Sequence, residues 1–271
     1  MKTAVIVTTY NRPDALGAVL EGYNAQQEPE FELIVADDGS TKETASVVEE
    51  FRDRATFPLQ YVWQEDRGFR AAAIRNRAIA STKADYLIFT DGDCIPSRKF
   101  VKAHRQMAEA GCFLGGNRVL LAPAFTARIL QEHIPIYRWH WASWVKAWFR
   151  REVNRVLPLL SLPDGVFRKW KTDRWEGIKT CNLSIWKNDL IRVNGLDESY
   201  QGWGLEDSDL VVRLLRAGVR HKSVRFAAPV FHLWHKEHDR GSLRDNQSRL
   251  NTLLSSSAIR AVAGLDQYDS V

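Results

Sequence analysis

The sequence predicts an α/β fold in which helices flank a mostly parallel central sheet. Short runs rich in β-branched and aromatic residues alternate four times with segments of helical periodicity in the first third of the chain, and the connections are short. Polar clusters follow three of the predicted strands, and a parallel sheet aligns those strand ends along one edge. The 271 residues suffice for one large α/β domain, or for one domain with an appended subdomain.

The first third of the chain contains the alternating elements. We expect strands at Thr3–Thr9, Phe31–Ala36, Leu59–Gln64 and Tyr86–Thr90. We expect helices at Ala15–Gln26, Thr41–Arg54 and Ala71–Ser81. Pro13 stands just before the first helix, where proline is well tolerated. This alternation predicts right-handed crossover connections.

The second half of the chain has fewer regular patterns. A strand is expected at Cys181–Lys187, and a helix at Leu210–Ala217 with Gly218 in its C′ position. A last strand is expected at Pro229–His235. The polar tail at Ser242–Ser257, with its scattered leucines, is predicted to form a helix or a lid over the site.

The composition indicates a globular protein. Apolar residues make up 45% of the chain and charged residues 26%, and no run is long and apolar enough to span a bilayer. The segment Met1–Val7 lacks the h-region and the cleavage site of a signal peptide. Cys94, Cys112 and Cys181 lack zinc-type spacing and are too few for a disulfide framework. These features favour a cytoplasmic location.

Two aspartates stand where the strand at 86–90 ends. In extended backbone, residues i and i+2 point the same way, so Asp91 and Asp93 can converge on one divalent cation, with Gly92 leaving room for a ligand. Carboxylate oxygens suit Mg²⁺ or Mn²⁺, which usually also bind substrate phosphates. The structural alternative is a tight acidic turn after a core strand.

Side chains at the neighbouring strand ends indicate a nucleotide site. The Tyr10 ring can stack on a nucleobase, and the Asp38 carboxylate can accept from an imide N–H such as that of uracil. Arg70 and Arg75, near a helix start, can meet phosphate charge. The structural alternatives are a helix staple for Tyr10, a turn former or N-cap for Asp38, and a solvated helix face for Arg75.

Three segments together resemble a known family. Val5–Arg12, Leu33–Ser40 and Asp91–Asp93, in this order, are similar to family 2 glycosyltransferases of GT-A fold. The resemblance covers roughly residues 3–118. It returns at 177–238, which resembles the C-terminal part shared with galactosyltransferase-like and chondroitin-polymerase-like enzymes. It implies a nucleotide-sugar donor, a divalent metal at the Asp-x-Asp motif, and inversion at the anomeric carbon.

The resemblance also implies roles for individual residues of the donor site. Thr8, Tyr10 and Asp38 would hold the uridine of a UDP-sugar. The complete donor site expected from the motifs and the helix start comprises Thr8, Tyr10, Arg12, Asp38, Arg70, Arg75, Asp91 and Asp93.

For the metal, the resemblance implies a small ligand set. Asp91 and Asp93 would hold the cation and the diphosphate, with Asp93 as the first choice of direct ligand. A neutral imidazole at the end of the last strand can complete the metal shell. His232 matches the family position, and His235 is the reserve candidate.

Acidic residues crowd the start of the helix expected near residue 210. Glu206, Asp207 and Asp209 lie in its first turn, where the helix dipole favours negative charge, so all three can serve simply as caps. Inversion requires a base that removes the proton of the acceptor hydroxyl. Trp203 beside them offers a flat apolar surface for a sugar ring. The Trp-Gly-x-Glu-Asp pattern of the resemblance implies Asp207 as the base and Glu206 as an acceptor contact.

Residues 128–175 depart from the resemblance. They contain six of the ten tryptophans, and ten basic against four acidic residues, a net charge of +6 compared with +5 for the whole chain. Helical spacing predicts one apolar face formed by Trp141, Trp144, Val145, Trp148, Val156 and Leu157, opposite Lys146 and Arg150. This composition is typical of an interfacial helix on an anionic membrane. The alternative is an acceptor-side subdomain with tryptophans in its core. A nucleic-acid partner is not expected.

These observations predict four parts: a nucleotide-sugar-binding half at 1–118, a Trp- and Arg-rich insertion at 119–176, an acceptor-binding and catalytic half at 177–241, and a tail at 242–271. We expect an inverting, metal-dependent glycosyltransferase that moves a hexose or N-acetylhexosamine from a UDP-sugar to a glycan or glycolipid hydroxyl. By analogy, it would act in bacterial lipopolysaccharide or capsule synthesis, in the cytoplasm at the inner face of the plasma membrane.

Two alternatives stay open at this point. A nucleotidyltransferase would bind its metal with the same Asp-x-Asp motif, but this function does not explain the acidic pattern at Trp203–Asp207. A non-catalytic glycan- or membrane-binding protein on the same scaffold would transfer nothing.

Overall fold

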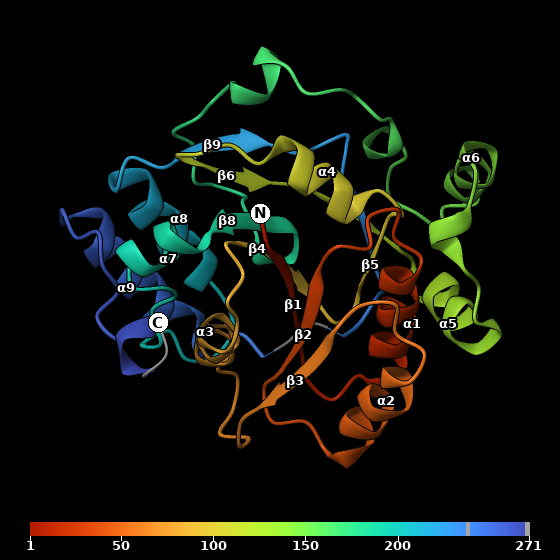
Figure 1. The fold of residues 1–271 in the computed structure, drawn as a ribbon, viewed down its shortest axis with the longest axis horizontal. Coiled ribbons are helices and arrows are strands. Elements are labelled where there is room, and N and C mark those ends of the chain that lie inside the picture. Colours follow the sequence, from red (N-terminus) through yellow and green to blue (C-terminus); the bar gives the residue numbers. More distant parts are fainter. Residues whose placement is uncertain (237–238, 269–271) are drawn as a thin grey trace.

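The computed structural model describes residues 1–236 and 239–268, and its centre is a seven-stranded mixed sheet (Figure 1). The strand order is β3-β2-β1-β4-β8-β6-β9. Four neighbouring strands run parallel: β1 (Thr3–Thr9), β2 (Glu32–Asp37), β3 (Leu59–Trp63) and β4 (Tyr86–Asp91). The predicted α/β fold with a mostly parallel sheet is confirmed. Residues 237–238 of the expected catalytic half and 269–271 of the expected tail lie outside the described residues.

Helices cover both faces of these parallel strands (Figure 1). The first three are α1 (Pro13–Asn24), α2 (Lys42–Arg52) and α3 (Ala71–Ser81). Val5 and Val7 of β1 pack in the core that includes α1 and α2, whereas Ala4 and Ile6 pack in the core that includes α3. Strands that are buried on both faces have near-continuous apolar sequences, and this pattern is the one that predicted them.

All seven elements predicted in the first third are present, and their ends differ from the prediction by at most two residues. Differences of two residues occur at both ends of α1, which begins at Pro13 instead of Ala15 and ends at Asn24 instead of Gln26, and at the end of α2, Arg52 instead of Arg54. Pro13 can open the helix because the first N–H groups of a helix have no intrahelical partner.

The sheet continues beyond β4 with strands from later in the chain. These are β8 (Leu183–Trp186), β6 (Cys112–Gly115) and β9 (Arg220–Ser223). β8 runs antiparallel to β4 and is shorter than predicted at both ends, because residues 180–182 form a 3-10 turn (η4) and α7 begins at Lys187. β6 and β9 were not predicted, since four residues carry too little pattern to identify a strand.

A second, three-stranded sheet lies where β4 ends. It consists of β5 (Cys94–Pro96), β10 (Val230–His232) and β7 (Arg118–Leu120), with β10 in the middle. The last strand was predicted over 229–235, but only 230–232 pair as a strand. Beyond them, the Leu233 N–H still donates to the carbonyl of Asp93 at 2.8 Å, which ties the end of β10 to the Asp-x-Asp turn.

Two helices from the C-terminal part pack on each other. α8 (Glu206–Arg216) has the acidic residues in its first turn, as predicted, and Gly218 follows it with φ 86°. The polar tail forms α9 (Leu243–Leu254), which confirms a helix there. Asn246 of α9 donates to the carbonyls of Gln201 and Gly204 at 3.1 and 3.0 Å, so α9 fixes the loop that precedes α8.

The remaining elements are short. The helices are α4 (Phe100–Met107), α5 (Pro123–Glu132), α6 (Trp141–Phe149) and α7 (Lys187–Arg192), and further 3-10 turns are η1 (Ile136–Arg138), η2 (Leu157–Leu159), η3 (Val166–Lys169) and η5 (Leu265–Gln267). Within the described parts of the chain, no helix combines the length and the apolarity needed to cross a bilayer.

The tryptophans of the insertion divide between core and surface. α6 ends at Phe149, so Val156 and Leu157 do not extend its apolar face, and that expectation is wrong. Trp144 is 4% exposed and stacks on Phe231 of β10 with ring centroids 4.3 Å apart. Trp141 and Trp148, in contrast, are 45% and 44% exposed. The single apolar face expected for this helix therefore has a buried part and an exposed part.

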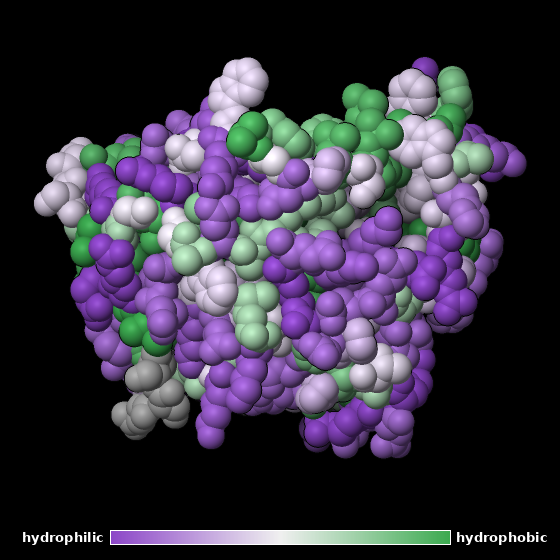
Figure 2. All heavy atoms as spheres, turned by 45° about the horizontal axis from the view of Figure 1, so that its top comes forward, coloured by the Kyte–Doolittle hydropathy of each residue, from purple (hydrophilic) through white to green (hydrophobic). Residues whose placement is uncertain are grey.

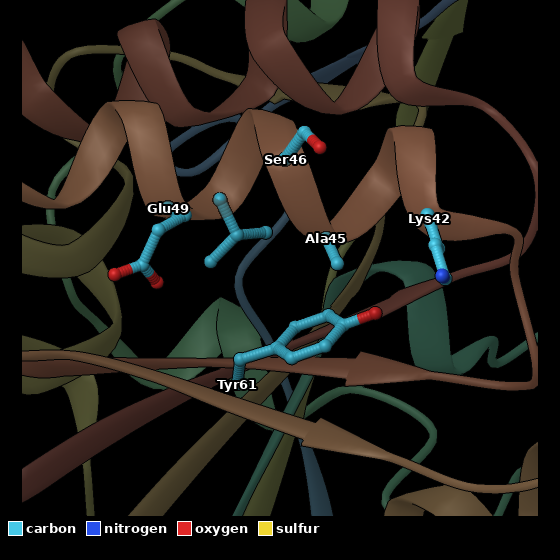
Figure 3. A pocket seen from close by; sticks show the side chains of 6 residues that line it. Lys42, Ala45, Ser46, Glu49 and Tyr61 are labelled. Carbon is cyan, nitrogen blue, oxygen red and sulfur yellow. The ribbon is translucent and has the colours of Figure 1, made fainter.

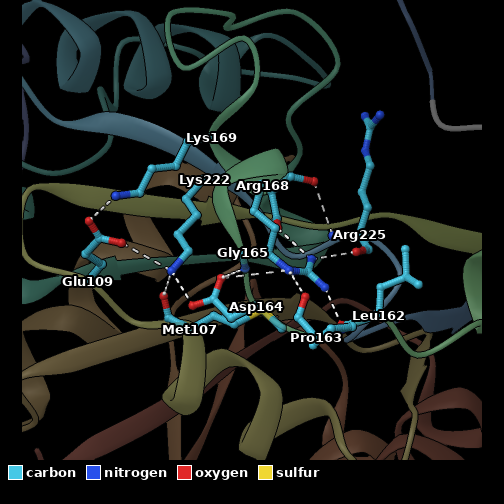
Figure 4. A network of polar contacts seen from close by, with 11 residues as sticks. Met107, Glu109, Leu162, Pro163, Asp164, Gly165, Arg168, Lys169, Lys222 and Arg225 are labelled. Carbon is cyan, nitrogen blue, oxygen red and sulfur yellow. Dashed lines mark hydrogen bonds and ion pairs between the residues drawn. The ribbon is translucent and has the colours of Figure 1, made fainter.

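Two buried cations attach the segment 161–170 to the sheet (Figure 4). The guanidinium of Arg168, 1% exposed, donates to the carbonyls of Leu162, Pro163, Ser223 and Arg225. The ammonium group of Lys222 in β9, itself buried, donates to Asp164 and Glu109 and to the carbonyl of Met107. We call Arg168 and Lys222 the latch.

Candidate active site

The parallel register brings the predicted strand ends together. Thr8 of β1 lies beside Asp91 of β4, and Thr9 lies beside Asp37 of β2. The Gly92 N–H donates to the carbonyl of Thr8 at 2.7 Å, and a Cβ at Gly92 would lie 2.7 Å from Thr9 Oγ1. Gly92 is thus required for packing against β1, and the space that we expected it to leave for a ligand is filled by Thr9.

Asp38 forms one wall of the site and is held from two sides. Its carboxylate accepts from Gln64 Nε2 at 2.5 Å and from the backbone N–H of Arg70 at 2.7 Å. Burial raises the pKa of Asp38, although these hydrogen bonds oppose the shift. The Arg70 guanidinium itself turns to the carbonyl of Glu65, at 2.6 Å. Asp38 is therefore a fixed acceptor at the end of β2.

Tyr10 stands at the open side of the same strand ends. Its ring is 42% exposed, and its hydroxyl donates to Asp66 at 2.9 Å. This hydrogen bond raises the pKa of Tyr10. The turn that follows is held by Asn11, whose N–H donates to Ser40 Oγ at 2.7 Å. Tyr10 presents an exposed ring that a planar base can cover.

Arg75 occupies the centre of the site. The side chain, 5% exposed, donates to Thr8 Oγ1 at 3.0 Å, to Asp91 at 3.2 Å and to Glu206 at 3.1 Å. Burial disfavours its charge, but Asp91, Glu206 and Asp207 outweigh this effect and raise the pKa of Arg75. A solvated helix face is therefore excluded for Arg75. Its guanidinium joins the end of β4 to the start of α8.

The carboxylate of Asp93 faces two histidines. Its Oδ2 lies 3.6 Å from His232 Nε2 and 3.3 Å from His235 Nε2. Burial lowers the pKa of His232 to about 4, so its imidazole is neutral at pH 7 and offers a lone pair. Single donor atoms of Asp93, Cys94 and His232 lie within 4.8 Å of one another, although Cys94 is fully buried behind Asp93. Carboxylate oxygens with a neutral imidazole fit Mn²⁺ or Mg²⁺.

Asp91 completes this acidic end of β4. Burial raises the pKa of Asp91 to about 6, while Arg75 opposes the shift and Asp93 adds to it. Positive charge brought to this position favours the ionised form of both carboxylates. A cation bound here would thus reduce the electrostatic repulsion between the two aspartates.

The start of α8 presents two carboxylates in different surroundings. Oδ2 of Asp207 accepts from the Thr180 N–H at 3.2 Å. Burial, with Asp207 next to it, raises the pKa of Glu206 to about 7, while Arg75 opposes the shift. Glu206 Oε2 is buried and has no hydrogen-bond partner among the described residues. Asp209 instead pairs with Arg213 at 2.6 Å inside the core, so its role is structural.

The loop before α8 has an unusual backbone. Leu205 has φ 77° and Gly204 has φ 107°, and left-handed backbone at a leucine is strained unless its surroundings hold it. A Cβ at Gly202 would lie 2.4 Å from Ser242 Oγ, so α9 and this loop meet closely. Trp203 lies in this loop, with the Arg240 guanidinium 5.2 Å from its ring centroid. The strained turn places Glu206 and Asp207 at the first positions of the helix.

The expected site residues thus fall into connected groups. Thr8, Arg75, Asp91 and Glu206 form one hydrogen-bonded network, and Asp93, Asp207, His232 and His235 adjoin it. Asp38 and Arg70 form a second group. Arg12 pairs with Asp14 at 3.0 Å. Its charge also lowers the pKa of His232, although burial and the charge of Arg118 lower that pKa more.

Two features of the site were missed at the sequence level. Arg118 in β7 lies on the face of the three-stranded sheet that carries His232, and its charge acts on Asp91 and His232. Among the described residues, Arg118 has no carboxylate within ion-pair distance. Gln64 and Asp66 follow β3, so the strand-end pattern used for the other strands would have identified them.

A cavity of about 370 Å³ between α2 and β3 lies outside this site (Figure 3). Lys42, Ser46, Glu49 and Tyr61 supply its polar groups, and the Tyr61 hydroxyl donates to Asp37 at 2.7 Å. None of the predicted site residues lines it.

Comparison with known proteins gives two family matches. Residues 4–160 match the family described as glycosyl transferase family 2, and residues 166–236 match the N-terminal domain of galactosyltransferase. The validoxylamine A glucosyltransferase of Streptomyces hygroscopicus subsp. jinggangensis is 32% identical over 233 residues, which cover 80% of this chain and 52% of that protein. The chondroitin synthase of Escherichia coli is 24% identical over 246 residues, 83% of this chain and 34% of that protein. The chain therefore spans about half, or less, of these two relatives.

Solved structures share the fold. Staphylococcus aureus TarS, residues 1–349, in complex with UDP has a TM-score of 0.62 at 15% identity, covering 99% of this chain and 69% of that one. The mannosyltransferase PcManGT from Pyrobaculum calidifontis, in complex with GDP-Man and Mn²⁺, has a TM-score of 0.62 at 18% identity, covering 94% and 64%.

Proposed function

This chain belongs to glycosyl transferase family 2 and has the GT-A fold, and we propose that it is an inverting, metal-dependent glycosyltransferase. It would move a hexose or N-acetylhexosamine from a UDP-sugar to a hydroxyl of a glycan or glycolipid acceptor. The observation that carries the proposal is the position of Arg75, which contacts Asp91 and Glu206 at the same time. Carboxylates suited to the donor and to the acceptor thus lie in one cluster.

The donor nucleotide would lie over the ends of β1 and β2. Tyr10 offers an exposed ring for stacking, and Asp38 offers a fixed carboxylate to the imide N–H of uracil. Thr8, Arg12 and Arg70 border this position. The TarS complex with UDP, on a similar fold, supports a uridine nucleotide here.

The diphosphate would lie between the end of β4 and β10. Asp91, Asp93 and His232 would hold a divalent cation, with His235 as the alternative imidazole, and this cation supplies positive charge beside the diphosphate. Arg118 would add a second positive charge on the same side. Arg75, whose three nitrogens each donate a hydrogen bond, to Thr8, Asp91 and Glu206, would position these carboxylates instead of meeting phosphate.

The acceptor would approach from α8. Thr180 holds one oxygen of Asp207, and the carboxylate would accept the proton of the acceptor hydroxyl as that oxygen bonds to the anomeric carbon. UDP leaves with the electron pair of the broken bond. The unpartnered Glu206 Oε2 would accept a hydrogen bond from the acceptor, and Trp203 would face its ring.

The division into parts at 1–118, 119–176, 177–241 and 242–271 is retained as part of this proposal. The basic, aromatic insertion would meet an anionic membrane surface, which suits a cytoplasmic enzyme of lipopolysaccharide or capsule synthesis. No nucleic-acid partner is proposed.

The test measures UDP binding by calorimetry with Mn²⁺, with Mg²⁺ and in EDTA. Binding should strengthen with either metal, and Asp93→Ala should remove that gain because it removes the ligand that faces both histidines. The exposed Asp53→Ala variant is the matched control and should behave as the wild type. Arg118→Gln should weaken binding equally with and without metal.

Two outcomes would contradict the proposal. Equal UDP affinity in EDTA and in Mn²⁺ would remove the metal from it. Incorporation of nucleotide from free NTP would identify a nucleotidyltransferase, and UDP binding without transfer or hydrolysis of any nucleotide sugar would identify a binding protein.

A further inference from the structure

A second cavity, of about 400 Å³, opens between the insertion and the three-stranded sheet. Its inner wall consists of the buried side chains of Trp144, Ala227, Pro229 and Phe231. Trp141 and Leu160, 45% and 43% exposed, lie at its mouth. We call it the aromatic cavity, and no part of the proposed transferase chemistry uses it.

The aromatic cavity is separated from the candidate active site by β10. Neighbouring residues of a strand point to opposite faces of the sheet. Phe231 lines the aromatic cavity, whereas His232 faces Asp93. An acceptor bound at Asp207 therefore does not reach it through the sheet, and its occupant is a different group or molecule.

The wall and the rim of the aromatic cavity have different chemistry. The wall offers carbon surface from Trp144, Phe231 and Ala227, with few hydrogen-bonding groups for sugar hydroxyls. The exposed rim carries Arg98, Lys99, Arg138 and His140, and no carboxylate is among the described residues that line the cavity. The arrangement fits an apolar chain that ends in an anionic group.

The surface of the insertion is also apolar and basic. Within the insertion, Phe149 is 75% exposed, Leu157 63%, Val166 92% and Trp170 77%. Figure 2 shows hydrophobic and aromatic side chains gathered along the upper edge of the molecule, above a largely hydrophilic face. Exposed apolar surface of this kind marks a binding surface, and the net charge of +6 over residues 128–175 complements an anionic one.

We propose that the aromatic cavity takes up the acyl chain of an anionic membrane phospholipid, with the headgroup phosphate at Arg98, Lys99 and Arg138. The insertion would then hold one lipid individually as well as attract the bilayer as a whole. This inference rests on the membrane contact in the proposed function and is independent of the transfer chemistry.

The experiment uses the full chain and vesicles of phosphatidylcholine with or without phosphatidylglycerol, at low salt. Sedimentation reports attachment. Quenching of tryptophan fluorescence by dibrominated acyl chains reports a chain beside the tryptophans of the insertion, and the part of the quenching that is lost when the aromatic cavity is narrowed reports a chain beside Trp144. The wild type should sediment with the anionic vesicles and be quenched. UDP calorimetry in parallel keeps the transferase site under separate observation.

Two variants separate the rim from the wall. Arg98→Glu with Lys99→Glu should weaken attachment about 30-fold or more, since each basic residue near an anionic surface is worth about 1 kcal/mol. Lys83→Glu with Arg192→Glu changes the same charge on other exposed positions and should have a smaller effect. Ala227→Leu narrows the cavity and should reduce quenching while sedimentation persists. Leu160→Phe at the mouth gives the same test if Ala227→Leu fails to fold.

The outcomes are distinguishable. If the wild type ignores anionic vesicles while it binds UDP, the membrane contact and this inference both fail and the transferase proposal stands. If it sediments but dibrominated chains do not quench it, or if Ala227→Leu and Leu160→Phe are quenched as strongly as the wild type, the inference alone is overturned. If dextran sulfate displaces it from vesicles and no acyl quenching occurs, the aromatic cavity is a site for an anionic glycan, which also overturns the inference.

Discussion

Two adjacent carboxylates, Glu206 and Asp207, differ because their surroundings differ. Glu206 has a pKa raised to about 7 by burial and by its neighbour, so at pH 7 it is partly protonated. Asp207 has one oxygen fixed by the Thr180 N–H. A base must be correctly placed and able to take up a proton, so the fixed carboxylate of Asp207 suits that role and the partly protonated Glu206 suits binding.

Asp207→Asn tests this assignment at nearly constant shape. The amide is a far poorer proton acceptor, so transfer should fall by about 100-fold or more. UDP affinity should stay unchanged, because Asp207 does not contact the proposed nucleotide position. Glu206→Gln serves as the comparison and should raise the KM for the acceptor more than it lowers kcat. Near-normal turnover of Asp207→Asn on its acceptor would assign the base to Glu206.

Among the individual site residues, the sequence predicted those that stand at or just after the end of a recognisable strand. Asp38, Asp91 and Asp93 follow long apolar runs, and the parallel register aligns them as expected. Arg118 was not predicted, because its position in the site depends on β7. This strand is only three residues long and pairs with β10, more than 100 residues later in the sequence. The hydrogen bond from Arg75 to Glu206 joins residues 131 positions apart, and no local pattern encodes it.

Among the elements, α4 is joined to η4 and β8 by a buried polar network outside the carboxylate cluster. His104 of α4 contacts Ser184 Oγ through Nδ1 at 2.7 Å and Asn182 Oδ1 through Nε2 at 3.1 Å. The Tyr86 hydroxyl meets the same Ser184 Oγ at 2.7 Å. Burial lowers the pKa of His104 to about 3. This histidine is neutral in the folded protein and protonates readily in the unfolded chain.

The network predicts a defined loss of stability in acid. Between pH 6.5 and about 3, the unfolded chain binds a proton at His104 that the folded protein does not, so the free energy of unfolding falls as pH falls. The contribution of His104 should be roughly 1.4 kcal/mol per pH unit within that window. His104→Gln should be less stable than the wild type at pH 7 and should lose less on acidification, as measured by denaturant unfolding at several pH values. Parallel curves for the two proteins would contradict this role.

The elements that prediction missed have a common physical cause. β6, β7 and β9 have three or four residues each, so their pairing depends on partners distant in sequence and not on a local pattern. The expected helical face over Trp141–Leu157 failed because α6 ends at Phe149, and of its tryptophans Trp144 stacks on Phe231 of β10, a partner distant in sequence. Long βα units in the first third were predicted well, since each carries its own periodicity.

In the whole molecule, the latch attaches the segment 161–170 of the insertion to the central sheet. Arg168 satisfies four carbonyls and Lys222 reaches across to Asp164 of the same segment (Figure 4). Removing a buried donor leaves its acceptors without partners, at about 1–3 kcal/mol for each buried group. The attachment is thus strong and local, and it lies apart from the carboxylate cluster.

Arg168→Met should release the segment and leave the rest folded. Chymotrypsin should cleave at Phe167 or Trp170 at least tenfold faster than in the wild type, because cleavage requires local opening, which the latch suppresses. UDP affinity should not change. Lys171→Met, at the exposed residue that directly follows the segment, is the control and should be cleaved as slowly as the wild type. Unchanged cleavage of Arg168→Met would show that other contacts hold the segment.

The chemistry of the latch also determines which side chains of this surface can change during evolution. The acceptors of Arg168 are backbone carbonyls, and every amino acid supplies the same carbonyl. Apart from Asp164, which accepts from Lys222, the exposed side chains of the segment 161–170 are therefore free to change through mutation without loss of the attachment, as long as the latch and the backbone path persist. Selection can thus alter what this face of the protein meets, one substitution at a time, while the inherited carboxylate cluster stays the same.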